Sequence, residues 1–453
     1  MKVITVGWNP NVILDLLKPI EEKSEIKFIH LFEFGSRRLQ KIKRKYSFNN
    51  IDCFAVDSVL EIANEFDLEL LHKLENVYHC SISCIIDTDC FLKDFQNKDI
   101  ALSYLSLIAK NLYLLLNKLK PDYVICSNDR AHSHITFAIC KLLEIPCYAF
   151  AFTVIPNDRT WFIDKLEPNC LVPFERENES DFSYELAQKV VSDYMDDKLS
   201  IMAYKAPFKL TDYFNKFYTK IIKTFFDQDI FLVPGITKPF LKNSIKDNLD
   251  RFKNRLALKY SQFIFTYNGK FAYFPLHMSN EAMVNTWAPM FIDQLALVRQ
   301  VSMSLPVGMK LIVKLHFSDP DYYSIKEIRK ILKLSNVLVA HPSSSSRWFI
   351  KNSSLVFGIS GTSCLEASLF GIPTILFSNS PYLHFPNTIR STDVTKLKDQ
   401  VFEMLKKNKP TQDQITTSFM NYVLRYKKGR INDWSIKSSQ SDQENFLKIL
   451  RSI

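Results

Sequence analysis

Glycine is scarce in this chain, with 9 among 453 residues, yet three of them (Gly358, Gly361 and Gly371) fall within fifteen positions. Long apolar runs are also missing: no stretch reaches the roughly eighteen uninterrupted apolar residues of a membrane-spanning helix. The first ten residues, MKVITVGWNP, resemble a first β-strand rather than a signal peptide. We therefore expect a cytoplasmic protein.

Paired Cys-x-x-Cys motifs are absent, although the chain has nine cysteines. The odd number, and the apolar runs around Cys126, Cys140 and Cys147, predict reduced and buried thiols. A further group invites a zinc interpretation: His79, Cys80, Cys84, Asp89 and Cys90. Without a paired motif, a packed helix or loop is the favoured interpretation there, and we predict no bound metal and no cofactor.

Positive charge is in excess, at +10 overall, and it is unevenly distributed. Residues 205–259 contain twelve lysines or arginines against five aspartates, interleaved with phenylalanine and tyrosine. Such a segment suits nucleic acid, an anionic membrane or an acidic polymer. Because we find no nucleic-acid-binding motif, we predict a surface for anionic lipid or glycan, with peripheral attachment to the inner face of the membrane. The alternative is a solvated helical face whose apolar side packs inward.

Short β-branched or aromatic runs alternate with helical stretches along most of the chain. In the first part the predicted strands are 2–7, 26–32, 51–57, 122–127 and 147–152, and the clearest helices are 100–119 and 134–143. The alternation restarts later, with predicted strands at 271–277, 309–316, 336–341, 354–360 and 373–378, and helices at 291–305, 325–334, 344–351 and from 362 onward. This rhythm predicts two α/β domains, each with a parallel sheet covered by helices.

Four regions follow from this pattern. We predict an N-terminal Rossmann-like domain over 1–175, a basic helical insertion or bridge over 176–265, a C-terminal Rossmann-like domain over 266–390 and C-terminal helices over 391–453. Two such domains face to face leave a cleft at the carboxyl ends of their strands, where ligands bind in open α/β sheets.

The clustered glycines lie at a corner of the second domain. The run FGISGTSCLEASLFGIPTILF (357–377) predicts a strand, a turn, a helix and a strand. Gly361 in the turn opens backbone N–H groups and the positive end of the helix dipole to a phosphate. Thr362 or Ser363 can cap this helix with a hydroxyl. Gly371 has the structural task of ending the helix.

Here the sequence resembles a known family. The segments YFPLHMSNE (273–281), KLH (314–316) and SGTSCLEASLFGIPTI (360–375) are similar, in this order, to the C-terminal half of GT-B glycosyltransferases. The closest resemblance is to the bacterial capsular polysaccharide synthesis group that includes Kdo transferases, and it covers about residues 271–385. It implies two Rossmann-like domains facing a central cleft, with a nucleotide-sugar donor held mainly by the C-terminal domain and an acceptor by the N-terminal one.

The activity implied by the resemblance is metal-independent transfer of a sugar, with CMP-Kdo as the first guess for the donor, to a growing surface polysaccharide or glycolipid. The sequence departs from the group at two places. The group usually has His-Pro at the end of the K-x-H strand, where this chain has HFSDP (316–320). It often has Gln-Pro-Glu after the preceding strand, where this chain has SNE (279–281), so that Glu281 survives the match.

A departing nucleotide phosphate must be stabilised by His, Lys, Arg and helix N–H groups when no metal is bound, and no Asp-x-Asp triplet stands in a clear strand-end context. We predict that eight residues hold the donor: His277, Lys314, His316, Ser360, Gly361, Thr362, Ser363 and Glu366. Glu366 either takes a ribose hydroxyl or merely complements the helix dipole. His277, His316 and His341 end successive predicted strands of one sheet, which favours a functional role.

Catalysis is assigned to Asp129, His132 and Glu281. The loop SNDRAHSH follows a predicted strand and opens a helix, so Asp129 could act as nucleophile or general base, with His132 or His134 as an alternative base. An aspartate in such a loop can also be a helix cap or half of a salt bridge. Residues 7–10, after the first strand, are a second candidate for lining the cleft.

Two other functions stay open at this point. A sugar-nucleotide 2-epimerase shares the fold and the glycine turn, but it needs acid and base carboxylates near the sugar in both domains. A non-catalytic partner in polysaccharide assembly or export, with a degenerate transferase domain, would explain the altered HFSDP segment. The expected partners are a nucleotide-sugar donor, a glycan or lipid-linked glycan acceptor and an anionic membrane surface through 205–259, and no nucleic acid.

Overall fold

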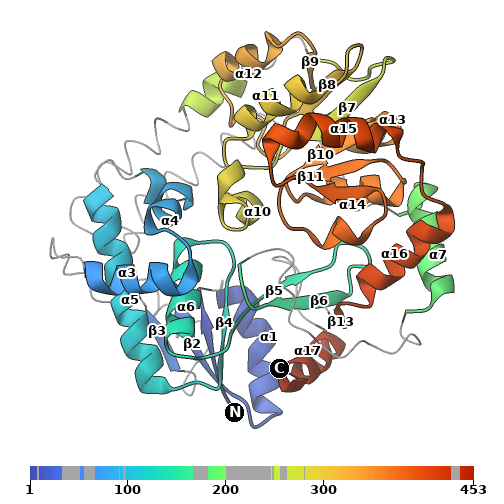
Figure 1. The fold of residues 1–453 in the computed structure, drawn as a ribbon. Coiled ribbons are helices and arrows are strands. Elements are labelled where there is room, and N and C mark those ends of the chain that lie inside the picture. The colour runs from blue at the N-terminus through green and yellow to red at the C-terminus, as the bar shows by residue number, and fades with distance from the viewer. Residues whose placement is uncertain are drawn as a thin grey trace.

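The computed structural model describes residues 1–7, 10–32, 52–55, 67–90, 92–94, 98–166, 182–199, 246, 249–255, 263–279, 281–429 and 439–452. They form two sheets, each covered by helices, and the two sheets lie in separate halves of the molecule (Figure 1). The chain is therefore an α/β protein with two Rossmann-like domains, in the GT-B-like arrangement that the sequence predicted.

The described residues of the first domain form a sheet of seven strands, with β1 flanked by parallel neighbours. Their order is β13 (Lys427–Lys428), β6 (Arg159–Ile163), β5 (Cys147–Phe152), β4 (Tyr123–Cys126), β1 (Lys2–Val6), β2 (Lys27–Phe32) and β3 (Asp52–Ala55). All five predicted strands are confirmed, and β6 and β13 add an antiparallel edge that the sequence did not predict. The helices before the bridge are α1 (Pro10–Glu22), α3 (Leu68–Tyr78), α4 (Ile82–Thr88), η1 (Leu92–Asp94), α5 (Lys98–Leu119) and α6 (Ala131–Leu142).

Helix α5 is the one described helix that is long and apolar enough to cross a membrane, with 22 residues and a mean hydropathy of 1.3. Half of that apolar stretch is buried inside the protein. It packs against α3 and α6 in the core of the first domain. Its length and hydropathy therefore have a structural explanation.

The sheet of the second domain has six strands, all parallel. Their order is β12 (Thr388–Arg390), β11 (Thr374–Leu376), β10 (Leu355–Gly358), β7 (Phe271–Pro275), β8 (Lys310–Lys314) and β9 (Val337–Ala340). The five predicted strands are confirmed and β12 is additional. The helical elements are α10 (Ala282–Asn285), η4 (Pro289–Phe291), α11 (Gln294–Ser304), α12 (Ile325–Leu332), α13 (Ser346–Asn352), α14 (Thr362–Leu369), η5 (Pro381–His384), η6 (Val394–Lys396) and α15 (Leu397–Lys406).

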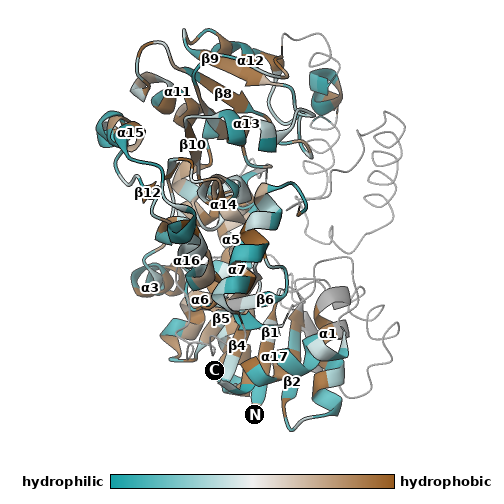
Figure 2. Ribbon diagram, turned by 90° about the vertical axis from the view of Figure 1, so that its right-hand side faces the viewer, coloured by the Kyte–Doolittle hydropathy of each residue, from teal (hydrophilic) through white to brown (hydrophobic). Residues whose placement is uncertain are grey.

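The central strands are apolar on both faces, as expected for parallel sheets covered by helices. Every residue of β4 and β10 is buried. Figure 2 shows this apolar character on the strands, while α15 on the outside is hydrophilic. Each buried Val, Leu, Ile or Phe side chain contributes about 1.5–3 kcal/mol to folding, so these strands fix the positions of the loops at their ends.

The C-terminal segment returns to the first domain. Helix α16 (Gln412–Val423) packs against α7 (Tyr184–Met195), and α17 (Gln440–Ser452) lies against α1. The Phe446 ring stacks 5.9 Å from the Phe162 ring, and the Tyr123 hydroxyl donates to the Leu450 carbonyl at 3.2 Å. Both chain ends therefore lie in the same domain (Figure 1).

The predicted basic bridge is described only in part. Helix α7 and the helical residues 249–255 belong to it. Most of 205–259 lies outside the described residues, so its role as a surface for lipid or glycan stays a prediction. The boundaries of the four predicted regions likewise stay predictions.

Candidate functional site

A cavity of about 560 Å³ lies at the carboxyl ends of β7, β8 and β10. Side chains of both domains line it, with Ala151 and Val154 on the first domain's side. Nine of the eleven predicted site residues line this cavity: His277, Glu281, Lys314, His316, Ser360, Gly361, Thr362, Ser363 and Glu366. The structure therefore brings these nine residues together around one cavity.

Strand register brings these residues together. Strands β7 and β8 pair in parallel with Pro275 opposite Lys314, and the Leu276 N–H donates to the Lys314 carbonyl at 2.9 Å. His277 and His316 each follow the end of one of these two strands. Strand β10 pairs with β7 on its other side and leads into the glycine turn. Because parallel strands end at one edge, the three loops meet there.

Lys314 is the most unusual group in the cavity. Its side chain lines the cavity, and the residue is only 3% exposed. Burial lowers the pKa of the ammonium group to about 8. Within the described part of the chain, this ammonium group makes no hydrogen bond or ion pair. A buried charge without a partner is costly, and an anionic ligand in the cavity would offset this cost.

His316 adds a neutral hydrogen-bond donor. Burial lowers its pKa below the ordinary value, and the charge of Lys314 acts in the same direction. The Ser318 N–H donates to the Nδ1 atom at 3.2 Å. The neutral ring therefore carries its proton on Nε2, which leaves that N–H free of the loop and available to a ligand.

His277 is oriented by a carboxylate. Its Nδ1 atom lies 3.0 Å from Oε2 of Glu281, and its backbone N–H donates to Gln294 at 2.7 Å. Burial favours the neutral form of Glu281, but His277 and His316 outweigh this and lower the pKa of Glu281. Glu281 is therefore ionised and holds the His277 ring, which would lie 3.1 Å from a Cβ atom added at Gly361.

The glycine turn forms the third side of the cavity's polar wall. Gly361 occupies the N-cap of α14, and no side chain caps this helix. The prediction that Thr362 or Ser363 caps it is wrong, because Thr362 is already the first helical residue. Three neighbouring helices, α11, α12 and α13, are capped by Asp293, Ser324 and Ser345. The absence of a side-chain cap leaves backbone N–H groups at the start of α14 available to a ligand, and with glycine at the N-cap it costs only about a few tenths of a kcal/mol of stability.

Ser360 and Gly371, which lie on either side of α14, differ in what they contact. The Ser360 hydroxyl is buried in the cavity wall and has no hydrogen-bond partner among the described residues. Gly371 has a φ of +67° and its N–H donates to the Ser368 carbonyl at 3.0 Å, which ends α14. The prediction of a structural role for Gly371 is confirmed.

Glu366 is held by residues that the sequence analysis did not identify. The Tyr194 hydroxyl, from α7, donates to Glu366 Oε2 at 2.5 Å. Burial raises the pKa of Glu366, although Tyr194 and Arg347 oppose this. The Arg347 guanidinium lies 4.1 Å above the Tyr194 ring and pairs with Asp197. Arg347 follows a run of serines after a predicted strand end, a signal that could have identified it as a cavity residue.

Three candidates from the sequence are not in the cavity. His132 is buried inside the first domain, with Nε2 2.8 Å from the Ser127 hydroxyl. Asp129 is half-buried and does not line the cavity. His341 ends its strand as expected, but its ring stacks 4.8 Å from the ring of Phe265, outside the cavity.

The loop before α6 has a structural explanation. Asp89 accepts hydrogen bonds from the Arg130 side chain at 3.1 Å and from the Ala131 N–H at 2.8 Å. Asp89 therefore supplies both a salt bridge in this loop and an acceptor for a backbone N–H at the start of α6. Among the described residues, no group of three His, Cys, Asp or Glu side chains is placed to hold a metal ion.

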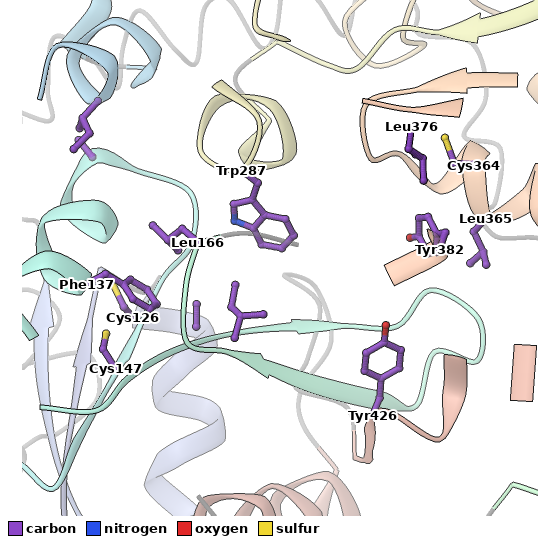
Figure 3. Close-up of a cluster of buried hydrophobic side chains, with 14 of the residues drawn as sticks. Cys126, Phe137, Cys147, Leu166, Trp287, Cys364, Leu365, Leu376, Tyr382 and Tyr426 are labelled. Atoms are coloured by element: carbon purple, nitrogen blue, oxygen red, sulfur yellow. The ribbon is translucent and has the colours of Figure 1, made fainter. Parts of the chain in front are cut away.

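The remaining wall of the cavity is aromatic, which the sequence did not predict. Figure 3 shows Trp287 pointing down from the end of α10 and Tyr426 pointing up from beside β13, into the space between the sheets, with Tyr382 near them. Tyr422 completes this wall, its ring centre 5.0 Å from that of Tyr426. The C-terminal segment thus contributes directly to the cavity.

No protein family and no curated protein matches the sequence. Among solved structures, the chain is similar to UDP-GlcNAc 2-epimerase from Methanocaldococcus jannaschii in complex with UDP-GlcNAc and UDP, at 13% identity over 100% of this chain and 99% of that one, with a TM-score of 0.32. It is also similar to KpsC, a beta Kdo 2,4 transferase from Thermosulfurimonas dismutans, at 9% identity over 66% of this chain and 79% of that one, with a TM-score of 0.35. Similarities this weak do not distinguish one activity from another, so the proposed function rests on the residues that line the cavity.

Proposed function

We propose that this protein is a metal-independent glycosyltransferase that uses a nucleotide-sugar donor. The observation that carries the proposal is the buried ammonium group of Lys314, which has no partner among the described residues and lines the same cavity as an uncapped helix N-terminus. A phosphate group would pair with the ammonium group and accept hydrogen bonds from the helix N–H groups, because it is an anion and it accepts several hydrogen bonds at once.

The chemistry of transfer needs this arrangement. When the bond between sugar and phosphate breaks, the leaving phosphate gains negative charge, and donors already in place stabilise it. Lys314 supplies a positive charge, His316 supplies its Nε2–H, and α14 supplies backbone N–H groups. His277, held by Glu281, supplies a further ring nitrogen at the cavity wall.

The nucleoside end of the donor is assigned to Glu366. Its Oε2 atom is taken by Tyr194, which fixes the carboxylate and leaves Oε1 to accept a hydroxyl. Glu366 is one turn into α14, so a ribose hydroxyl there would extend a nucleotide along the cavity from the phosphate at the turn.

The acceptor side supports transfer over epimerisation. Among the described residues, the carboxylates that line the cavity are Glu281 and Glu366, and both come from the second domain. Among the described residues, Ala151 in strand β5 and Val154 in the loop after it line the cavity, and both are apolar. An epimerase that uses acid and base carboxylates from both domains is not matched by the described part of this wall. A surface glycan or glycolipid acceptor remains our proposal, and CMP-Kdo is the first donor to test.

The proposal is tested by incubating the full-length protein with CMP-, UDP- and GDP-sugars and separating the products. Transfer releases the nucleotide and moves the sugar to an acceptor or, more slowly, to water. An epimerase would instead return a nucleotide-sugar inverted at one carbon with the nucleotide still attached. Protein that binds and consumes none of the donors would contradict the proposal and favour an assembly role.

A further inference from the structure

The loops that follow β7 and β8 are tied together by one carboxylate. Oδ2 of Asp319 accepts hydrogen bonds from the Ser279 N–H at 3.0 Å and from the Ser279 hydroxyl. The Asp319 side chain is only 9% exposed. The loop that carries His316 is thereby bonded to the loop that carries His277.

The other oxygen of Asp319 reaches outside the sheet, to the bridge. Oδ1 pairs with Arg251, which lies on the helix over 249–255. Arg251 also donates to the Ser279 hydroxyl at 3.4 Å and lies 5.6 Å above the Tyr322 ring. Figure 1 shows this short yellow-green helix beside α12.

A second carboxylate strengthens the attachment of the same helix. Asp321 lies 3.8 Å from Arg251 and 3.7 Å from Arg255, and its backbone carbonyl accepts from Asn254 at 3.2 Å. Burial raises the pKa of Asp321, and the two arginines oppose this. Because these groups are mostly shielded from water, the network is stronger than separate surface ion pairs.

We propose that Asp319 is a positioning residue: it fixes His316 and His277 relative to each other and makes their placement depend on the docking of the 249–255 helix. Asp319 follows Ser318, whose N–H holds the His316 ring, and Ser279 is two residues after His277. We call the bonds of Asp319 to Ser279 and Arg251 the clamp. Loss of the clamp therefore displaces the two histidines before it disturbs the buried strands.

The clamp also explains the two departures from the GT-B pattern together. Asp319 belongs to the residues that separate His316 from the following proline, and Ser279 belongs to the SNE segment. Each departure provides one side of the same hydrogen bonds. Asp319 in the HFSDP segment thus supports the site, an inference that deepens the proposed function and rests on it.

The test uses full-length protein with Asp319→Asn, Arg251→Gln and the double variant. The histidine ring signals are followed by NMR through a pH titration, and the affinities for UDP, CMP and GDP are measured by calorimetry. We expect the single variants to shift the His316 and His277 signals and to weaken nucleotide binding about tenfold, since small misplacements of binding groups are costly. The double variant should be no more than about twofold weaker than the worse single one, because both remove one network.

Lys253→Gln is the matched control. This lysine is on the same helix, its side chain is 74% exposed, and its ion pair is with Asp250. It should leave the signals and affinities unchanged. If Asp319→Asn does not fold, Ser279→Ala removes one bond of the clamp and should shift the same signals by a smaller amount.

The outcomes separate the two proposals. Folded Asp319→Asn protein with wild-type histidine signals and wild-type affinity would overturn the positioning role. If the wild type binds none of the three nucleotides, the proposed function falls, and the histidine signals alone decide the role of Asp319.

Discussion

The two walls of the cavity differ in chemistry and in how they are built. The second domain presents a buried lysine, two histidines and an uncapped helix, all at the ends of adjacent strands. The opposite wall presents Ala151 and Val154 with aromatic side chains from the returning C-terminal segment. One domain therefore holds the features that bind charge, and the other shapes the space in which an acceptor would lie.

The largest effect should come from the charged wall, with His316→Ala. Removing one preorganised donor to a developing phosphate charge typically lowers kcat by about 100- to 1,000-fold. His341→Ala is the matched control, because this histidine also ends a strand but does not line the cavity. Donor turnover is measured alongside thermal melting. Equal activity of the two variants would remove His316 from the site.

Gly361→Val should weaken nucleotide binding about 100-fold by calorimetry. A Cβ atom added there would lie 3.1 Å from the His277 ring, and the branches of valine would occupy the approach of the phosphate to α14. Gly361→Ala, which adds only the Cβ atom, should have a smaller effect. Wild-type affinity in the valine variant would make the turn structural only.

Lys314 should cost the ligand-free protein stability. Burial depresses its pKa from about 10.5 to about 8, so below pH 8 the folded state bears the whole penalty of a buried charge, about 3 kcal/mol. Between pH 8 and 10.5 the unfolded state binds more protons than the folded state, so stability rises with pH. We expect Lys314→Met to be more stable than the wild type at pH 7, and this advantage should shrink between pH 8 and 10.5 in denaturant titrations. A constant difference across that range would contradict the account.

In the interior of the first domain, His132→Asn should lower the stability of the fold and leave ligand binding unchanged. His132 is buried beside Ser127, and a Cβ atom added at Gly7 would overlap its ring. Loss of a buried hydrogen bond costs about 1–3 kcal/mol of stability. Nucleotide affinity, measured below the lowered melting temperature, should stay at the wild-type value. A selective loss of binding would restore His132 to the site.

The sequence predicted the second domain well because each signal there is local. A strand, a turn and a helix follow one another in 357–377, and a histidine after a strand must lie at the carboxyl edge of the sheet. The residues it missed interact across long separations in the sequence. Tyr194 and Arg347 are in contact although 153 positions separate them along the chain. Tyr426 reaches the cavity only because the C-terminal segment returns to the first sheet. Asp129 and His132 had the right local context but do not line the cavity, because no local pattern encodes where a side chain is placed.

The central claim is that the Lys314 ammonium group binds the phosphate of a nucleotide. The most direct test is calorimetric titration of UDP, CMP and GDP into wild-type protein, Lys314→Met and Lys310→Met at pH 7. Lys310 is on the same strand and donates to the Ser335 carbonyl at 2.9 Å, away from the cavity. We predict that Lys310→Met binds as the wild type does and that Lys314→Met binds at least about 100-fold more weakly, the cost of about 3 kcal/mol for losing a buried charge pair. Unchanged nucleotide binding in well-folded Lys314→Met protein would contradict the account.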